Sequence, residues 1–257
     1  MRSINSGCKW VERIKTSFAL ALLLLTSCAS SQLDQAEQWQ SQLHAEHALV
    51  GMIWDSQADE FIEANELFAR TERVSYLLLG EKHDNPDHHA LQLRALDHVL
   101  QTNTVSTVSF EMMSSEQQPL LQELSAYRQS SLEQINEYLQ WDNEGWDWDY
   151  YAPLLHSAMQ SDVLINAANI SNEEMMQVYG APTAAKIEGV LDEQTMAALE
   201  KDIDESHCGM LPESQFPAMV RVQQARDFAM AGSLAASSPQ QIQVLIAGNY
   251  HIRRDLG

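Results

Sequence analysis

Apolar runs that alternate with helical stretches constrain the fold of this 257-residue chain more than any other feature. Four runs have the length and composition of buried strands, and they span residues 75–79, 105–110, 162–168 and 241–247. Helical patterns cover residues 86–101, 115–139, 148–160 and about 190–236. This alternation predicts an α/β fold with a mainly parallel central sheet, flanked by helices on both faces. The span 170–215 has few apolar stripes and is expected to form a helical lid or insertion, while a shorter apolar run covers residues 49–54.

The first 27 residues have the pattern of a secretion signal. Basic residues precede an apolar segment at 18–25, which is too short to span a bilayer. The sequence Leu-Thr-Ser-Cys at 25–28 resembles the bacterial lipoprotein box, which would make Cys28 the lipidated first residue of the mature protein. Ala29 after this cysteine favours the outer membrane of the cell envelope. The alternative is an ordinary signal peptide in which the cysteine is incidental.

Composition limits the domain organisation, the disulfides and the partners that the rest of the chain can have. Residues 28–47 are rich in polar side chains and predict a tether, so residues 48–257 are expected to form a single α/β domain. After loss of the signal and lipidation of Cys28, only Cys208 would remain as a thiol, and no disulfide within the chain is predicted. The formal net charge of −21 argues against nucleic acid as a partner.

Polar side chains follow each of the four predicted strands. The carboxyl ends of parallel strands meet at one edge of a sheet, where open α/β proteins bind their ligands. We therefore expect these side chains to lie in one pocket, where two carboxylates and two imidazoles could bind a metal or transfer protons. A carboxylate that caps a helix, or an asparagine in a turn, remains the alternative for each strand end. The residues are Glu81 and His83, Glu111, Asn169, and Asn249 with His251.

A charged pair lies on an otherwise apolar helical stretch. Arg226 and Asp227 share one face with Gln223, and charged groups on such a face need partners. One interpretation is a structural ion pair that holds the helix to the sheet. The other places both residues behind the site, with Arg226 paired to Glu81 or Glu111 and Asp227 orienting a histidine.

Six segments occur in an order that resembles one known family. They are GEKHDNPDHHALQLRAL, SFEMM, WDWDYYAPLLHSA, HCGMLP, VQQARDFAMA and IAGNYHIRRDLG. Together they resemble the ChaN family of haem-binding lipoproteins, which is grouped with the Tiki proteases and the erythromycin esterase-like proteins. The resemblance implies an EreA/ChaN-like α/β fold, lipid anchoring, and haem binding in iron uptake. It also implies a homodimer that can hold haem between its subunits. Related proteins continue beyond the Asp-Leu-Gly with which this sequence ends, so the domain is expected to be shortened at its carboxyl end.

The resemblance implies a tyrosine as the ligand of the haem iron, and three tyrosines are candidates. Tyr150 and Tyr151 lie in an aromatic cluster at 141–151, which suits a porphyrin face but could equally anchor the core. Helical spacing places Tyr151 inward and Tyr150 outward, and Tyr250 follows the last strand. His88 is expected to face the ligand, whereas His89 either contacts the ligand or packs against the sheet.

A metal-dependent hydrolase, as among the Tiki and esterase-like relatives, is the alternative function. Its divalent metal would be held by Glu81, His83 and His251, and Glu81 or Glu111 would act as the base on a metal-bound water. No nucleophile elbow and no HExxH motif occur in the sequence. The two functions use the same residues, so the sequence alone leaves both open.

Overall fold

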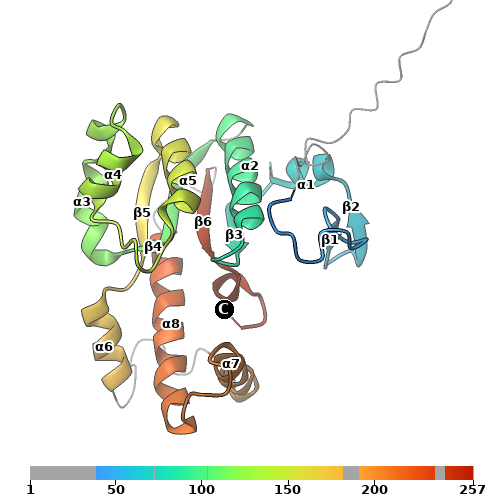
Figure 1. Ribbon diagram of the computed structural model, residues 1–257, viewed down its shortest axis with the longest axis vertical. Helices are drawn as coiled ribbons and strands as arrows, with labels where there is room; N and C mark the ends of the chain where they lie inside the picture. Colours follow the sequence, from blue (N-terminus) through green and yellow to red (C-terminus); the bar gives the residue numbers. More distant parts are fainter. Residues whose placement is uncertain (1–38, 72, 103, 182–190, 235–240, 257) are drawn as a thin grey trace, which may run out of the picture. The chain divides into compact units, whose positions relative to one another are not determined.

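A four-stranded parallel sheet forms the centre of the fold (Figure 1). The computed structural model describes residues 39–71, 73–102, 104–181, 191–234 and 241–256, so the signal and Cys28 lie outside the described residues. Every hydrogen-bonded neighbour in the sheet is parallel, as the sequence predicts. The strand order is β3 (Tyr76–Glu81), β6 (Ile242–Gly248), β4 (Val105–Ser114) and β5 (Leu164–Asn169).

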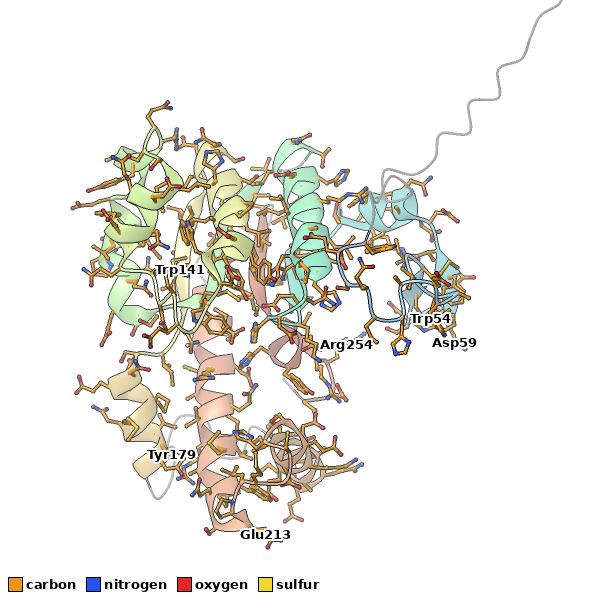
Figure 2. All side chains as sticks on the ribbon, in the orientation of Figure 1. Trp54, Asp59, Trp141, Tyr179, Glu213 and Arg254 are labelled. Carbon is orange, nitrogen blue, oxygen red and sulfur yellow. The ribbon has the colours of Figure 1, made fainter. Side chains whose placement is uncertain are left out.

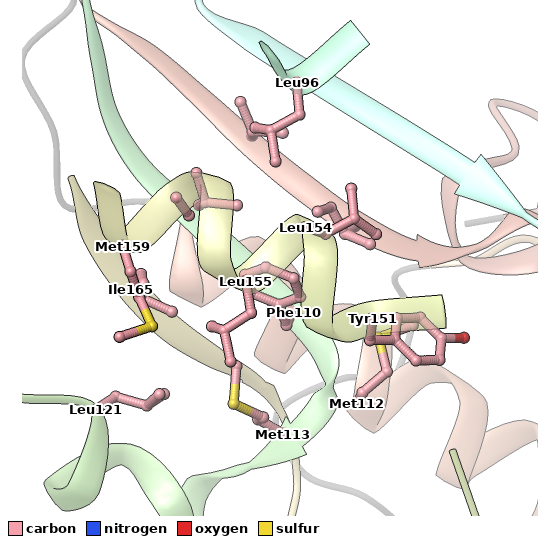
Figure 3. Packing of buried hydrophobic residues seen from close by; sticks show 14 of the residues in the cluster. Leu96, Phe110, Met112, Met113, Leu121, Tyr151, Leu154, Leu155, Met159 and Ile165 are labelled. Carbon is pink, nitrogen blue, oxygen red and sulfur yellow. The ribbon is translucent and has the colours of Figure 1, made fainter. Parts of the chain in front are cut away.

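One face of the sheet is covered by α2 (Pro86–Thr102) and α5 (Trp148–Gln160). Their buried side chains pack on the apolar residues of β4 and β6, as Figure 3 shows for Leu154 and Phe110. Two further helices, α3 (Gln118–Gln122) and α4 (Leu132–Leu139), extend this layer. Trp141, labelled in Figure 2, belongs to the same core. This cluster is the main hydrophobic core of the described chain.

The other face is covered by the end of α8 (Phe216–Ser233), where Met230 and Leu234 pack on Leu245 and Ala247. The first part of α8 extends past the carboxyl ends of the strands, together with α6 (Asn172–Gly180) and α7 (Glu193–Ser206) (Figure 1). The described part of the insertion predicted at 170–215 consists of α6, α7 and a short turn, η3 (Glu213–Gln215). Leu199 and Ile203 of α7 pack with Val220 of α8 and with Leu256 in a small apolar cluster.

Residues 39–71 precede the sheet. The apolar run at 49–54 contributes to β1 (Ile53–Asp55), which pairs with β2 (Glu60–Ile62) in a separate antiparallel hairpin, and α1 (Ala64–Thr71) follows. The backbone N–H groups of Gln40 and Ser41 donate to the carboxylate of Asp87, at 2.8 and 2.9 Å. The predicted tether is therefore hydrogen-bonded to the first turn of α2 over these residues.

Two predicted helical stretches are interrupted. The stretch 115–139 contains the short 3₁₀ turns η1 (Ser115–Gln117) and η2 (Leu124–Tyr127) beside α3 and α4. The stretch 190–236 is broken between α7 and α8, where Cys208 and Gly209 have φ angles of 56° and 66°. Pro212 follows this left-handed turn, so a continuous helix cannot form there. Within the described residues, no helix has both the length and the hydropathy that a membrane span requires.

The core predicts a contrast between two leucines. Leu154 on α5 is 0% exposed and Leu164 on the edge strand β5 is 68% exposed. Leu154→Ala should lower the free energy of unfolding by about 2–5 kcal/mol, because it opens a cavity in the core. Leu164→Ala should change it by less than about 0.5 kcal/mol. Urea unfolding followed by circular dichroism measures both, and equal losses in the two variants would contradict this packing.

Candidate functional site

The first half of the site lies at the end of β3. The carboxylate of Glu81 is fully buried, and its Oε1 lies 2.6 Å from Nδ1 of His83. The hydroxyl of Tyr151 donates to the same oxygen at 3.0 Å. Burial alone would lower the pKa of His83, but the hydrogen bond and charge of Glu81 outweigh it and raise that pKa. Burial and the charge of Glu81 both raise the pKa of Tyr151, so its phenol stays protonated.

The second half is built around Glu111 on β4, whose side chain is also buried. Its Oε2 accepts a hydrogen bond of 2.7 Å from the backbone N–H of Gly248, at the end of β6. Its Oε1 lies 3.3 Å from Nε2 of His251. The side-chain amide of Asn169 on β5 donates to the Glu111 carbonyl at 3.1 Å. Glu111 thus connects the ends of three neighbouring strands.

His251 belongs to η4 (Asn249–Ile252), the turn that follows β6, and its imidazole lies between two carboxylates. Its Nδ1 lies 2.5 Å from Oδ1 of Asp227, and the side-chain amide nitrogen of Gln223 lies 2.9 Å from the same Nδ1. Burial would lower the pKa of His251, but Asp227 and Glu111 raise it to about 9. In return, His251 lowers the pKa of Glu111 against the opposing effect of burial. At neutral pH the structure holds an imidazolium between two carboxylates.

The two halves meet over Gly248. A Cβ atom at this position would lie 2.7 Å from Cε1 of His83 and 3.5 Å from Oε2 of Glu111. The absence of a side chain therefore lets the imidazole of His83 approach the backbone of β6. The strand ends meet at one edge as predicted, but they do not all line one pocket. Glu81 is sealed from solvent behind the other groups, and Asn169 lines a different cavity from His83 and His251.

A cavity of about 230 Å³ opens in front of these groups. Its polar lining residues include His83, Glu111, Asn249 and His251. The insertion and the end of the described chain contribute both apolar and polar side chains. The other lining residues are Trp146, Leu199, Asp202, Ile203, Ser206, Gln223, Arg226, Gly248, Tyr250 and Leu256.

The three candidate tyrosines lie in different surroundings. Tyr151 is buried, as its helical spacing predicts, and its hydroxyl is bound to Glu81. Tyr150 is half-buried and its ring stacks on His89, with 4.7 Å between ring centroids. Tyr250 is 49% exposed and lines the cavity. No hydrogen bond of the Tyr250 hydroxyl is formed within the described part of the chain.

The candidate histidines of α2 support the backbone of the loop after β3. His89 is buried and donates from Nε2 to the carbonyl of His83 at 3.2 Å. His88 accepts at Nδ1 a hydrogen bond of 3.0 Å from the backbone N–H of Lys82. The structure therefore places both side chains against this loop, outside the lining of the cavity.

The structure corrects the prediction that Arg226 forms an ion pair. Neither interpretation of Arg226 is realised, because its guanidinium forms no ion pair with Glu81, Glu111 or Asp227. Asp227 contacts a histidine, His251, as the second interpretation expected, whereas both oxygens of Glu111 are already engaged by Gly248 and His251. His251, and not Arg226, therefore supplies the positive charge beside Glu111.

Trp146 is a lining residue that sequence reasoning placed in the aromatic cluster without assigning it to the site. Its ring meets His83 edge to face, with 4.8 Å between ring centroids. Its backbone carbonyl accepts a hydrogen bond from the indole N–H of Trp141, which anchors the loop before α5 in the core. A sequence signal for this contact is lacking, because it depends on how α5 packs against β3.

The alternative metal site is not assembled in the structure. Within the described residues, no group of three or more His, Cys, Asp and Glu side chains is arranged to hold a metal ion. Glu81, His83 and His251 were the expected ligands. Oε1 of Glu81 is engaged by His83 and Tyr151, and both ring nitrogens of His251 lie against carboxylates.

The charge of His251 predicts a pH dependence of stability. Because the pKa of the folded state is about 9 and the ordinary value is 6.5, the contribution is complete below about pH 6.5 and is lost as pH rises through 9. At about 1.4 kcal/mol for each pH unit, the free energy of unfolding should fall by about 3 kcal/mol over this range. His251→Gln should flatten the slope and His156→Gln, on an exposed histidine, should retain it. Urea unfolding at a series of pH values measures this, and a slope unaffected by His251→Gln would refute the assignment.

A family model described as haem-binding uptake, Tiki superfamily, ChaN matches residues 67–257. No curated protein sequence gives a significant match. Among solved structures, ChaN of Campylobacter jejuni, described with cofacial haem binding, is 24% identical with a TM-score of 0.71, and the match covers 80% of this chain and 82% of that one.

A second solved structure is more distant. RRSP, a MARTX toxin effector domain from Vibrio vulnificus, is 15% identical with a TM-score of 0.43, and the match covers 77% of this chain and 32% of that one. The family model, in contrast, spans the whole central sheet and every group of the site described above. The chain therefore belongs to the ChaN family of haem-binding uptake proteins in the Tiki superfamily.

Proposed function

We propose that this protein binds haem at the carboxyl edge of its sheet and holds it for iron uptake at the bacterial cell envelope. The observation that carries the proposal is Tyr250, an exposed phenol at a cavity whose lining combines apolar and polar side chains. A tyrosine phenolate is a known ligand of haem iron. Leu199, Ile203 and Leu256 are the apolar lining residues that suit a porphyrin face.

Tyr250 is the best suited of the three tyrosines. An iron ligand must lose its proton and be reached by the metal. Tyr151 meets neither condition, because its hydroxyl is bound to the buried Glu81 and its pKa is raised. Tyr150 is held face to face against His89. Tyr250 alone among them combines exposure with a position on the cavity lining in the described structure.

We propose that the protein forms a homodimer around haem, and the size of the cavity supports this proposal. Its volume of about 230 Å³ is below the roughly 300–1,000 Å³ of pockets that enclose a drug-sized ligand, so a porphyrin would lie across its mouth. One face of the haem would then be uncovered, and a second copy of the chain with its own haem would cover it. Cofacial haem binding in ChaN of Campylobacter jejuni supports this arrangement.

Membrane attachment is proposed to depend on the lipid at Cys28. The supporting observations are the Leu-Thr-Ser-Cys sequence at 25–28 and the absence, among described helices, of one that could span a membrane. A lipid chain adds about 0.8 kcal/mol of membrane affinity for each buried methylene. Ala29 favours the outer membrane as the location.

A hydrolase remains the second candidate, favoured by two acid–imidazole pairs of which His83, Glu111 and His251 line one cavity. Glu81 with His83 and Glu111 with His251 could each transfer a proton to or from a bound substrate. The metal-dependent form of this proposal predicts binding of zinc or manganese that is lost in His83→Ala and His251→Ala. Calorimetric titration of both metals measures it, and haemin binding without metal binding would favour the haem carrier.

Haemin binding tests the assignment of Tyr250. The wild-type protein should give a shifted Soret band on titration with haemin, because the phenolate binds the iron. Tyr250→Phe should weaken the affinity at least about tenfold, which corresponds to about 1.4 kcal/mol, and should change the band. Tyr150→Phe is the matched control and should leave both unchanged. Loss of the band in Tyr150→Phe with retention in Tyr250→Phe would contradict the assignment.

Membrane fractionation tests the anchor. Cys28→Ala should leave the protein unprocessed or soluble, because the lipid would be its means of attachment. Cys208→Ala is the control, since this exposed thiol has no part in lipidation and the variant should stay membrane-bound. Retention of Cys28→Ala in membranes after carbonate washing would exclude the lipoprotein proposal.

A further inference from the structure

Arg226 lies where two cavities meet. The cavity at Tyr250 and a second cavity of about 520 Å³ share Glu111, Trp146 and Arg226 as lining residues. The second cavity extends from the end of β4 towards α3 and α6, and Asn169, Asn172 and Gln117 contribute to its polar wall. A ligand that lies across the first cavity can therefore contact Arg226 as well as Tyr250.

The guanidinium of Arg226 has no partner within the described residues. Its Nε is buried and donates to no hydrogen-bond acceptor, and none of its nitrogens forms an ion pair there. Other arginines near the site are bonded to the protein. Arg221, on the same helix, donates to the carbonyls of Val178 and Tyr179, and Arg253 pairs with Asp202 and Asp255. A buried donor without an acceptor is destabilising, so its retention at a cavity points to a ligand.

The carboxylates around Arg226 are engaged elsewhere. Glu111 and Asp227 both contact His251, and Asp202 contacts Arg253. Asp142 and Glu116 line the second cavity, but Asp142 accepts from the backbone N–H groups of Glu144 and Gly145. Neither Asp142 nor Glu116 forms an ion pair with Arg226 in the described structure. The guanidinium thus remains available to an anion from outside the protein.

We propose that Arg226 binds a carboxylate of the ligand, which for haem is a propionate. This inference rests on the proposed haem-binding function and adds the second point of attachment. A planar guanidinium presents paired N–H donors that match the two oxygens of a carboxylate. The chain carries a net charge of −21 and repels anions in general, so a local cation is needed to accept one. Tyr250 and Arg226 would then fix opposite parts of one amphipathic ligand.

Esterified porphyrins isolate the contribution of the carboxylates. Haemin and haemin dimethyl ester differ only in their propionates, and both are titrated in the same detergent. Wild type should bind haemin at least about tenfold more tightly than the ester, which corresponds to about 1.4 kcal/mol. Arg226→Gln should bring this ratio close to one. Arg226→Lys keeps the charge without the paired donors, and it should retain part of the preference.

Two controls separate the direct contact from other effects. Arg254→Gln removes the same charge from an exposed arginine three residues after His251, labelled in Figure 2, and should keep the wild-type ratio. Tyr250→Phe should weaken the binding of both porphyrins and leave the ratio unchanged. Protoporphyrin without iron, compared with its dimethyl ester by tryptophan quenching, reads the same preference without a bond to iron. Circular dichroism verifies that each variant is folded.

The outcomes distinguish this inference from the function on which it rests. If wild type binds haemin with a Soret shift and Arg226→Gln keeps the preference for the free acid, the role of Arg226 is refuted and haem binding stands. If wild type binds neither haemin nor protoporphyrin, the proposed function and the inference both fail. Loss of the preference in Arg226→Gln, with retention in Arg254→Gln, establishes the carboxylate site.

Discussion

The buried carboxylate of Glu111 is the interaction on which the arrangement of the site depends. It joins β4 to β6 through the N–H of Gly248, and it joins the sheet to η4 through His251. The backbone carbonyl of the same residue is bound by Asn169 of β5. An ionised carboxylate without partners would be strongly disfavoured in such a buried position. The imidazolium of His251 supplies the opposite charge, and Asp227 keeps that imidazolium in place from α8.

The need of buried charged groups for partners divides the polar residues of the site into two groups with different roles. The first group is held by contacts within the protein: Glu81 with His83 and Tyr151, and Glu111 with His251. Tyr250 and Arg226 have no such partners within the described residues, although both line the cavity. A preorganised frame with a few available polar groups is the usual form of a small-molecule site. The proposed haem function therefore depends on the residues that the frame leaves available.

Much of the architecture could be predicted from the sequence, because each strand is an apolar run followed by polar residues. The run 241–247 corresponds almost residue for residue to β6 (Ile242–Gly248), and the prediction of a parallel sheet is confirmed. The order of the strands could not be predicted, since all four runs are similarly apolar. Interruption of the stretch 190–236 depends on the left-handed turn at Cys208 and Gly209, of which only the glycine is a recognisable signal.

Which residues gather at the site could be predicted from the sequence more readily than which of them pair with one another. The sequence brings acids, imidazoles and Arg226 to one edge, but it does not say which cation neutralises which carboxylate. That choice depends on the distance between α8 and η4, which lets Asp227 reach His251 and leaves Arg226 turned towards the cavities. The contact between Tyr151 and Glu81 likewise requires residues that are seventy positions apart to meet. Helical spacing placed Tyr151 inward, but its partner became visible only in the structure.

The titration of His251 tests the central role of Glu111 most directly. Nuclear magnetic resonance of the imidazole protons should give a pKa of about 9 in the wild-type protein. In Glu111→Gln the pKa should fall, because one of the two carboxylates that stabilise the imidazolium becomes neutral while Asp227 remains. Asp162→Asn, which removes an acid from an exposed ion pair with Arg128, should leave the pKa unchanged. A pKa near 6.5 in wild type, or one that is unaffected by Glu111→Gln, would contradict the account.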